Sequence, residues 1–572
     1  MPLSPATSPS SAHALASDTP CYTGFAADLH CHGFNARDLP IEGFIRCFFR
    51  GYRGKRGERF PWAVRALLSR PVKAFVAAVS VGVDTAAAEL GRLNGGKAVT
   101  PPVELADLPA APDKDALLRE AVLDIPADAS HLKYDAVDDD ETRVARYLQE
   151  QAVNDEELRE WIKEWIDEPS AELPPSSLKM DDPFDKLRRL VARAFNWAVG
   201  LFKSLRAFLK ALRRSRHDNL QEMATLSRPV TLFTPALVDF DQWANGDAAD
   251  SSMASQVELQ EALAIRAYAG KIVARSISVH GFVGFNPLQE IKGVAAYVDP
   301  KHLTADPPSW TDLDELPRNA RSFDVVRDAI EERGFVGVKL YLNCGFWPTG
   351  NALRGRADGH AIDGALDRLY DWCAVNGVPL LVHTGESNAF AQDFRACSHP
   401  DGWRPVLARH KKLRICLAHF ALHAPVDVNE GGDPWIHAAA RLALDEAGRV
   451  FFDISNTDTL DDDERKALTG ALTGENASLQ SQLFYGSDYF MCELNHEPST
   501  GYFDRAEKDL CHRLDLEPGF CRSFFADAAL RFLGLRDEHG QPATGGNRER
   551  LLRWYDTKAK AEPPEFLRAR PE

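Results

Sequence analysis

The stretch Phe25-Ala-Ala-Asp-Leu-His-Cys-His32 has the pattern of a buried strand that ends in two histidines. Its alanines and leucine can lie in a core, whereas His30 and His32 stand two residues apart. Successive side chains of a strand point to opposite faces, so these two histidines project from the same face. Two imidazoles on one face at the end of a strand supply half of a metal site.

The composition of the chain is that of a folded protein with an acidic surface. Of its 572 residues, 44% are apolar and 26% are charged, as in ordinary globular domains. The formal net charge of −17 excludes general nucleic-acid binding, because the phosphates would be repelled. No apolar run of about 18 residues is present, so no membrane span is expected. The 10 cysteines are scattered without a C-x-x-C pair, which favours a reduced, cytoplasmic protein.

The region before residue 228 divides into three parts. Residues 1–20 are rich in Ser, Ala and Pro and contain no Lys or Arg, which predicts a disordered tail. Residues 21–60 contain the first strand and an aromatic, basic loop that we expect to line a pocket. Residues 61–227 contain alanine-rich and acidic helical patterns broken by Pro-rich segments, which predict a helical insertion.

A basic amphipathic helix is expected near the end of this insertion. Between residues 183 and 214, apolar side chains recur at three- and four-residue steps, and Lys and Arg fill many of the polar positions. Such an apolar stripe most often packs within its own chain. The alternatives are docking on a protein partner and attachment to a membrane surface.

Short apolar runs alternate with helical patterns from residue 228 onward. The runs lie at 229–237, 277–284, 336–342, 379–382, 413–417, 450–454 and 483–485. Nearly continuous apolar strands that alternate with helices predict a parallel sheet covered by helices on both faces.

With the first strand there are eight such units of strand and helix. We therefore predict an α/β fold, a (β/α)8 TIM-like barrel, with the insertion 61–227 between strands 1 and 2. A doubly wound sheet is the alternative fold. The barrel would continue over 228–535, and 536–572 would form a C-terminal extension.

Polar residues follow several of these strands directly. His383 follows the fifth strand, His419 the sixth and Asp488 the eighth, while Lys339 lies in the fourth. In (β/α)8 barrels the active site is built where the strands reach their carboxyl ends. These residues are therefore expected to meet the histidines of the first strand at one end of the barrel.

Five motifs resemble those of the amidohydrolase superfamily. They are Asp28-Leu-His-Cys-His32, Gly337-Val-Lys-Leu-Tyr341, Val382-His-Thr-Gly-Glu386, Ala418-His-Phe420 and Tyr485-Gly-Ser-Asp488. The branch that they resemble most contains aminocarboxymuconate-semialdehyde decarboxylase and related metal-dependent hydrolases. The resemblance covers residues 25–32 and roughly 228–535.

This resemblance implies a metal site and its ligands. His30, His32 and His383 would bind a divalent metal, most simply one Zn²⁺ with Mn²⁺ as the alternative, and leave one position open. Asp488 would be a fourth ligand or lie beside the metal, where it could accept a proton from water. His419 would polarise the substrate or move a proton.

Further residues have less specific roles in the same resemblance. Lys339 would either pack or face the substrate, or else become a carbamate that bridges two metals. Tyr341, Glu386 and Tyr489 are candidates for the substrate pocket. Asp28 is a candidate for orienting the histidines of the first strand.

The expected function is that of a metal-dependent hydrolase that attacks a C–N or C–O bond of a small molecule. The alternative is a non-oxidative decarboxylase of an unsaturated or aromatic acid, in which arginines would hold carboxylates. The candidate arginines are Arg37, Arg46, Arg50 and Arg395. A third interpretation is a non-catalytic scaffold that acts through the helix at 183–214. Homo-oligomer formation is compatible with each of these functions.

Overall fold

The computed structural model describes most of the predicted barrel and parts of the chain before it. The described ranges are 22–40, 83–95, 140–154, 208–243, 248–295, 321–385, 392–421, 435–456, 462–492 and 501–568. Residues 209, 242, 513 and 515 are left out of these ranges, and residues 119 and 191 are described singly. The predicted tail 1–20, Arg46, Arg50 and Glu386 lie outside them.

All strand pairs in the described sheets are parallel. The strands are β1 (Ala26–Cys31), β2 (Val230–Pro235), β3 (Ser278–Val279), β4 (Phe282–Gly284), β5 (Gly337–Leu340), β6 (Leu380–Val382), β7 (Ile415–Leu417), β8 (Val450–Asp453) and β9 (Leu483–Phe484). Their order in the sheets is the order in the sequence, β1-β2-β3 and β4 through β9. β3 and β4 both fall within the single run predicted at 277–284, so the strands occupy eight positions.

Backbone contacts join these sheets into a closed barrel. A parallel bridge between Ala236 and Phe282 connects the end of β2 to β4. On the other side, the amide of Leu29 in β1 donates to the carbonyl of Tyr485 after β9 at 3.2 Å. The amide of Asp488 donates to the carbonyl of His30 at 2.7 Å. The predicted α/β TIM-barrel fold is confirmed, and the doubly wound alternative is wrong because the first and last strands are hydrogen-bonded.

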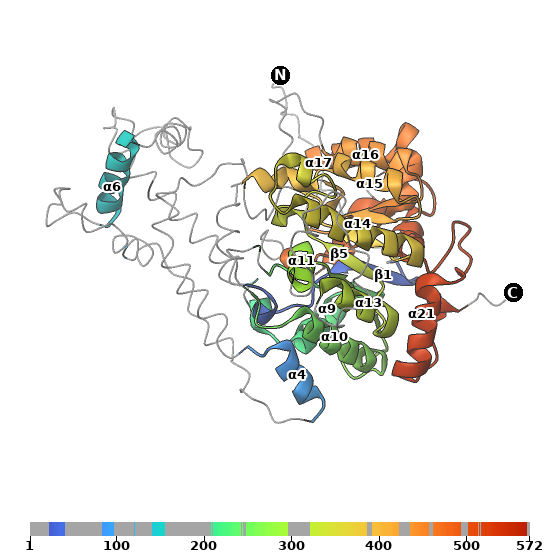
Figure 1. The fold of residues 1–572 in the computed structure, drawn as a ribbon. Helices are drawn as coiled ribbons and strands as arrows, with labels where there is room; N and C mark the ends of the chain where they lie inside the picture. The colour runs from blue at the N-terminus through green and yellow to red at the C-terminus, as the bar shows by residue number, and fades with distance from the viewer. Residues whose placement is uncertain are drawn as a thin grey trace, which may run out of the picture.

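Helices surround the strands (Figure 1). After β2 they are α10 (Met253–Tyr268), α11 (Pro287–Ala295), α13 (Ser322–Glu332), α14 (Gly359–Asn376), α15 (Arg404–Arg409), α16 (Trp435–Asp445), α17 (Asp462–Leu472), α18 (Tyr502–Ala506), α19 (Phe520–Arg522), α20 (Ala528–Phe532) and α21 (Gly546–Trp554). A side-chain cap begins α10, where the Ser252 hydroxyl accepts from the amide of Ser255. The strands are buried on both faces, which explains their continuous apolar runs.

Three helices are described between β1 and β2. They are α4 (Ala86–Leu93), α6 (Asp140–Asn154) and α9 (Arg216–Leu226). The extent of the helical insertion stays a prediction, because most of 61–227 lies outside the described residues. Three residues from the end of the predicted basic helix, Phe208, Ala211 and Leu212, are buried. The Phe208 ring lies 5.5 Å from that of Phe490. This end of the apolar stripe therefore packs within the chain, while a role in partner or membrane binding stays a prediction.

A buried ion cluster joins α4 and α9 to the loop that follows β1. The guanidinium of Arg216 donates to Asp38 (Nε to Oδ2, 2.8 Å) and to Glu89 (Nη1 to Oε2, 3.1 Å). The three residues are exposed by only 5%, 2% and 1%. Asp38 belongs to a short helical turn, Ala36–Asp38, that begins four residues after His32. The cluster therefore anchors the chain segment that leads away from the first-strand histidines.

Two of the described cysteines form a disulfide, whereas the sequence analysis expects reduced cysteines. Cys511 and Cys521 form a disulfide, with their Cα atoms 5.4 Å apart. The expectation that the cysteines are reduced is wrong for this pair. The segments 507–512 and 520–522 fold back on one another, and this tertiary contact is not visible in the cysteine spacing. No helix in the described part of the chain is long and apolar enough to cross a membrane.

Candidate metal centre

The two first-strand histidines meet Asp488 at the carboxyl end of the barrel. His30 is in β1 and His32 directly follows it, and both are buried. The Nε2 atoms of His30 and His32 lie 3.6 and 3.0 Å from Oδ1 of Asp488. Potential ligand atoms of these three residues all lie within 4.8 Å of one another. The backbone bonds that close the barrel hold this arrangement, because Asp488 donates its amide hydrogen to the carbonyl of His30.

The tautomer of His32 leaves a lone pair that faces Asp488. The Nδ1 atom of His32 lies 2.9 Å from the carbonyl oxygen of Ala236. A carbonyl oxygen only accepts hydrogen bonds, so we assign a proton to Nδ1. In the neutral ring the Nε2 atom then carries a lone pair, 3.0 Å from a carboxylate oxygen. Two acceptors at this distance are stable only with a cation between them, which is either a proton or a metal ion.

His30 has the same tautomer for a different reason. Its Nδ1 atom lies 3.0 Å from Oδ2 of Asp453, which places the proton on Nδ1. The Nε2 lone pair is left facing the site, where the ammonium of Lys339 donates to it at 3.1 Å. Burial, and secondarily the charge of Lys339, lowers the pKa of His30 to about 4. The ring is therefore neutral at pH 7, which is the form that binds metals.

His383 and His419 form a hydrogen-bonded chain beside this group. Nδ1 of His419 lies 2.9 Å from the carbonyl oxygen of Ser455, so we assign its proton there. Its Nε2 atom then accepts from Nδ1 of His383 at 3.2 Å. This leaves a lone pair on the buried Nε2 atom of His383, which has no hydrogen-bond partner among the described residues. Burial also lowers the pKa of His383 well below its usual value.

These donor atoms fit a divalent transition metal. Three neutral imidazole nitrogens and one carboxylate are the ligand types that zinc prefers. Burial is the largest single effect and opposes the charge of Asp488, but the contacts with His32, His30 and His419 together outweigh it and hold the pKa of Asp488 below its usual range. His383 is not one of the three residues whose potential ligand atoms lie within 4.8 Å of one another. It lies beside His419, and the two ring centroids are 5.0 Å apart. Of the described residues, His30, His32, His383 and Asp488 could hold the metal.

Asp453 is a residue of the site that the sequence analysis missed. It is the last residue of β8 and is fully buried. One oxygen accepts from His30, and the other accepts from the backbone amides of His419 (2.9 Å) and Ser455 (3.0 Å). The signal in the sequence is weak, because Asp453 lies inside the apolar run 450–454, whereas His383, His419 and Asp488 follow their runs.

The remaining predicted residues are placed in different ways. Lys339 is buried in β5 and faces His30. The Tyr341 ring stacks on His383 with centroids 4.3 Å apart. The Tyr489 hydroxyl donates to Glu222 of α9 at 2.8 Å. The role of each of these residues stays a prediction.

Asp28 contacts the backbone of the site and not the imidazole rings. Its Oδ1 atom accepts from the amides of His30 (3.3 Å) and Ser487 (3.0 Å), which belong to the first and last strand ends. Burial raises the pKa of Asp28 to about 7. Its contacts are those of a residue that joins the two ends of the barrel beside the metal ligands.

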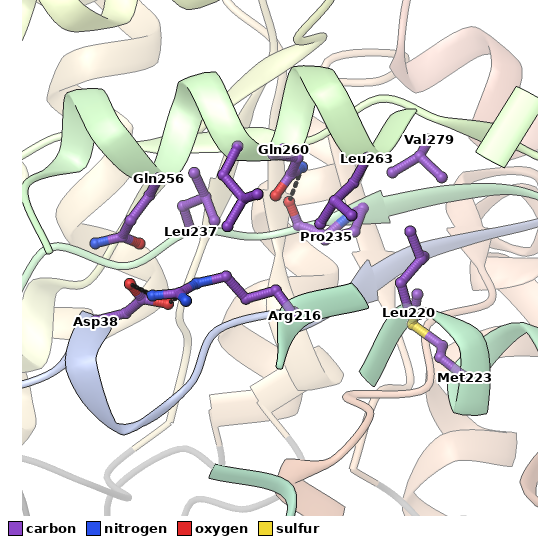
Figure 2. Close-up of a pocket in the computed structure, with 12 residues that line it drawn as sticks. Asp38, Arg216, Leu220, Met223, Pro235, Leu237, Gln256, Gln260, Leu263 and Val279 are labelled. Atoms are coloured by element: carbon purple, nitrogen blue, oxygen red, sulfur yellow. Dashed lines mark hydrogen bonds and ion pairs between the residues drawn. The ribbon is translucent and has the colours of Figure 1, made fainter. Parts of the chain in front are cut away.

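A pocket lies on the other side of the loop after β1. Figure 2 shows the Asp38–Arg216 pair on one side of it and Gln256, Gln260 and Leu263 of α10 on another. Leu220 and Met223 of α9 complete much of its apolar lining. Neither the predicted metal ligands nor His419 line this pocket. It is therefore separate from the candidate metal centre.

Comparisons with known proteins give one family match and several distant solved structures. Residues 309–535 match the amidohydrolase family. Among solved structures, an uncharacterized TIM-barrel protein from Bordetella bronchiseptica is 14% identical over 55% of this chain and 81% of that chain, with a TM-score of 0.33. The 4-oxalomesaconate hydratase from Rhodopseudomonas palustris is 14% identical over 73% of this chain and 95% of that chain, with a TM-score of 0.32. Among curated proteins, none matches the chain.

Proposed function

Because residues 309–535 match the amidohydrolase family, we propose that this protein is a metal-dependent hydrolase of the amidohydrolase superfamily. Its substrate is a small organic molecule with a hydrolysable C–N or C–O bond. The observation that carries the proposal is the set of three buried imidazole lone pairs, on His30, His32 and His383, beside the carboxylate of Asp488. A bound divalent metal would supply Lewis-acid chemistry and lower the pKa of water to about 7.

The residues of the chain have separate tasks in this reaction. Asp488 stays ionised in its buried position and accepts a proton from the attacking water. His419 relays this proton to the leaving group through its Nε2 atom, while its Nδ1 atom stays bonded to the carbonyl of Ser455 at 2.9 Å. Tyr341 stacks on His383 and forms an aromatic wall with Phe240, whose ring centroid is 4.9 Å away. This wall favours substrates with a planar group.

Decarboxylation of an unsaturated acid is the second candidate, because it uses the same ligands. It needs arginines that converge on the substrate carboxylates. Of the candidate arginines in the described residues, Arg37 pairs instead with Asp250 on the far side of its loop, and Arg395 lies buried in the segment Gln392–Ser398. Hydrolysis therefore remains the first proposal. The scaffold function is the third, and it requires no metal.

Metal content is the experiment that tests the proposal. We expect purified protein to contain about one zinc or manganese per chain, since three histidines and one carboxylate make one such site. The double variant His30→Ala/His383→Ala is expected to lose it, because half of the ligands are gone. Elemental analysis of both proteins after growth with added zinc measures this directly. A wild-type protein without metal would contradict the enzyme function and favour the scaffold.

Lys339 distinguishes one-metal from two-metal chemistry. Burial lowers the pKa of Lys339 to about 8, so at pH 7 its ammonium still occupies the lone pair of His30 that the metal needs. Lys339 is then neutral in roughly one tenth of the molecules, and only these leave the His30 lone pair free for zinc. Lys339→Met frees this lone pair in every molecule, so we expect it to raise zinc affinity about tenfold at pH 7. The gain is expected to vanish above pH 9, where the lysine of the wild type is neutral as well.

The zinc affinity of both proteins is measured by competition with a chromophoric chelator at pH 7 and pH 9. If Lys339 instead carries a carbamate that bridges two metals, wild-type protein contains two metals per chain. Lys339→Met would then lower metal content and affinity at both pH values. The sign of the change therefore decides between the two forms of the site.

A further inference from the structure

We infer that Asp453 is a positioning residue that holds the metal ligand His30 and the proton donor His419 in one hydrogen-bonded unit. This inference rests on the proposed function for its purpose, but its geometry can be tested without metal. The unit consists of Asp453 and Ser455 with the two histidines. All four residues are buried.

One oxygen of Asp453 determines which nitrogen of His30 binds metal. Oδ2 lies 3.0 Å from Nδ1 of His30. A carboxylate only accepts hydrogen bonds, so it retains the proton on Nδ1 and leaves Nε2 free. The Ser455 hydroxyl also lies 2.8 Å from this nitrogen, but it is engaged as a donor to Asp453. Hydrogen bonds of this kind orient metal-binding histidines and raise their affinity for the metal.

The other oxygen of Asp453 holds the backbone at His419. Oδ1 accepts from the His419 amide at 2.9 Å. His419, Phe420 and Ala421 have φ values of 62°, 45° and 56°, which is the left-handed region that residues with a side chain rarely adopt. Three such residues in a row persist only when the surrounding structure holds them. The turn after β7 thus presents the His419 ring to His383 because a buried carboxylate fixes its first amide.

Asp453→Asn tests this role because it keeps the shape and changes the hydrogen bonding. Three donors converge on Oδ1, from the His419 amide and from the amide and hydroxyl of Ser455. The asparagine oxygen is expected to face these donors, so its NH₂ group faces Nδ1 of His30. The NH₂ group then donates to Nδ1 in competition with the acceptor oxygen of Ser455, which favours the tautomer with the proton on Nε2. A protonated Nε2 cannot bind a metal.

The first measurement is nitrogen-15 NMR of metal-free protein with labelled histidines. In Asp453→Asn, one histidine is expected to change from the Nδ1–H to the Nε2–H tautomer, and His30→Gln identifies its signal. The second is zinc affinity, which we expect to fall roughly 100-fold, with an altered visible spectrum of the cobalt-substituted protein. Asp363→Asn is the matched control, because its carboxylate also accepts three N–H bonds, and all three come from Asn351 and Ala352 and not from a histidine of the site.

The outcomes separate this inference from the proposed function. An unchanged His30 tautomer, or zinc affinity within threefold of wild type, overturns the role of Asp453 while the metal site stands. A wild-type protein that binds no metal overturns the function, and the tautomer still tests the geometry. If Asp453→Asn does not fold, Ser455→Ala decides instead. It removes one donor to Asp453, and we expect zinc affinity to fall about tenfold, whereas an unchanged affinity overturns the inference.

Discussion

Zinc added to the metal-free protein is expected to raise its melting temperature by several degrees, and His32→Ala is expected to abolish most of this rise. A ligand that binds only the folded state at 1,000 times its Kd stabilises it by about 4 kcal/mol. His32 and Asp488 would both hold the metal, since the Nε2 atom of His32 lies 3.0 Å from Oδ1 of Asp488. Without the imidazole, one of the closest ligands is lost, and Asp488 loses its nearest partner.

Differential scanning calorimetry of both proteins, with and without zinc, measures this effect. His539→Ala is the matched control, because its side chain is 77% exposed and far from the site in sequence, so the zinc response should be that of wild type. Magnesium provides a second control, since it prefers oxygen ligands and should give little stabilisation. An equal rise in wild type and His32→Ala would place the zinc elsewhere.

Arg216→Met is expected to lower the free energy of unfolding by about 3–5 kcal/mol, because it leaves two buried carboxylates without their cation. Arg216 donates to both Asp38 and Glu89, and neither carboxylate side chain is more than 2% exposed. Burial alone would lower the pKa of Arg216, but the charges of Asp38 and Glu89 raise it, so the guanidinium remains charged. Methionine conserves much of the volume and isolates the loss of charge.

A surface arginine with two carboxylate partners, as Arg216 has, is the control for this variant. Arg404 pairs with Asp401 and Asp445, but the three side chains are 39%, 45% and 60% exposed. Arg404→Met should therefore change stability by only about 0–1 kcal/mol. Denaturant melts of the three proteins compare them directly. Equal losses for Arg216→Met and Arg404→Met would mean that burial of the cluster adds nothing to its strength.

The barrel was predictable from the sequence because its signals are local. Each strand is a short apolar run, and each helix follows it with its own periodicity, so the order of elements needs no long-range information. The run at 277–284 shows the limit of such reasoning, since the structure divides it into β3 and β4. The sheet changes partner there, because Ala236 pairs with Phe282 after β2 has paired with β3.

Most residues of the candidate site could be predicted from the sequence, but the hydrogen bonds between them could not. His30, His32, His383 and Asp488 each follow or end a strand, and parallel strands bring their carboxyl ends together. Asp453 ends β8 in the same way, but in the sequence it lies inside the apolar run 450–454, so it does not stand out as a polar residue that follows a strand. Its partner His30 is 423 residues away in sequence. No spacing rule connects two residues at that separation.

The sequence by itself determined the alternation of strands and helices, the parallel sheet that this alternation implies and the polar residues near the carboxyl ends of the strands, whereas the hydrogen bonds between the first and last strands decided that the sheet closes. Periodicity and strand endings carry this information within short segments. Only the tertiary structure decided which ring nitrogens carry protons, that Arg216 joins Asp38 to Glu89, and that Cys511 pairs with Cys521. The physical reason is that hydrogen bonds and charges depend on distances of about 3 Å. Such distances arise between remote segments only when the barrel closes.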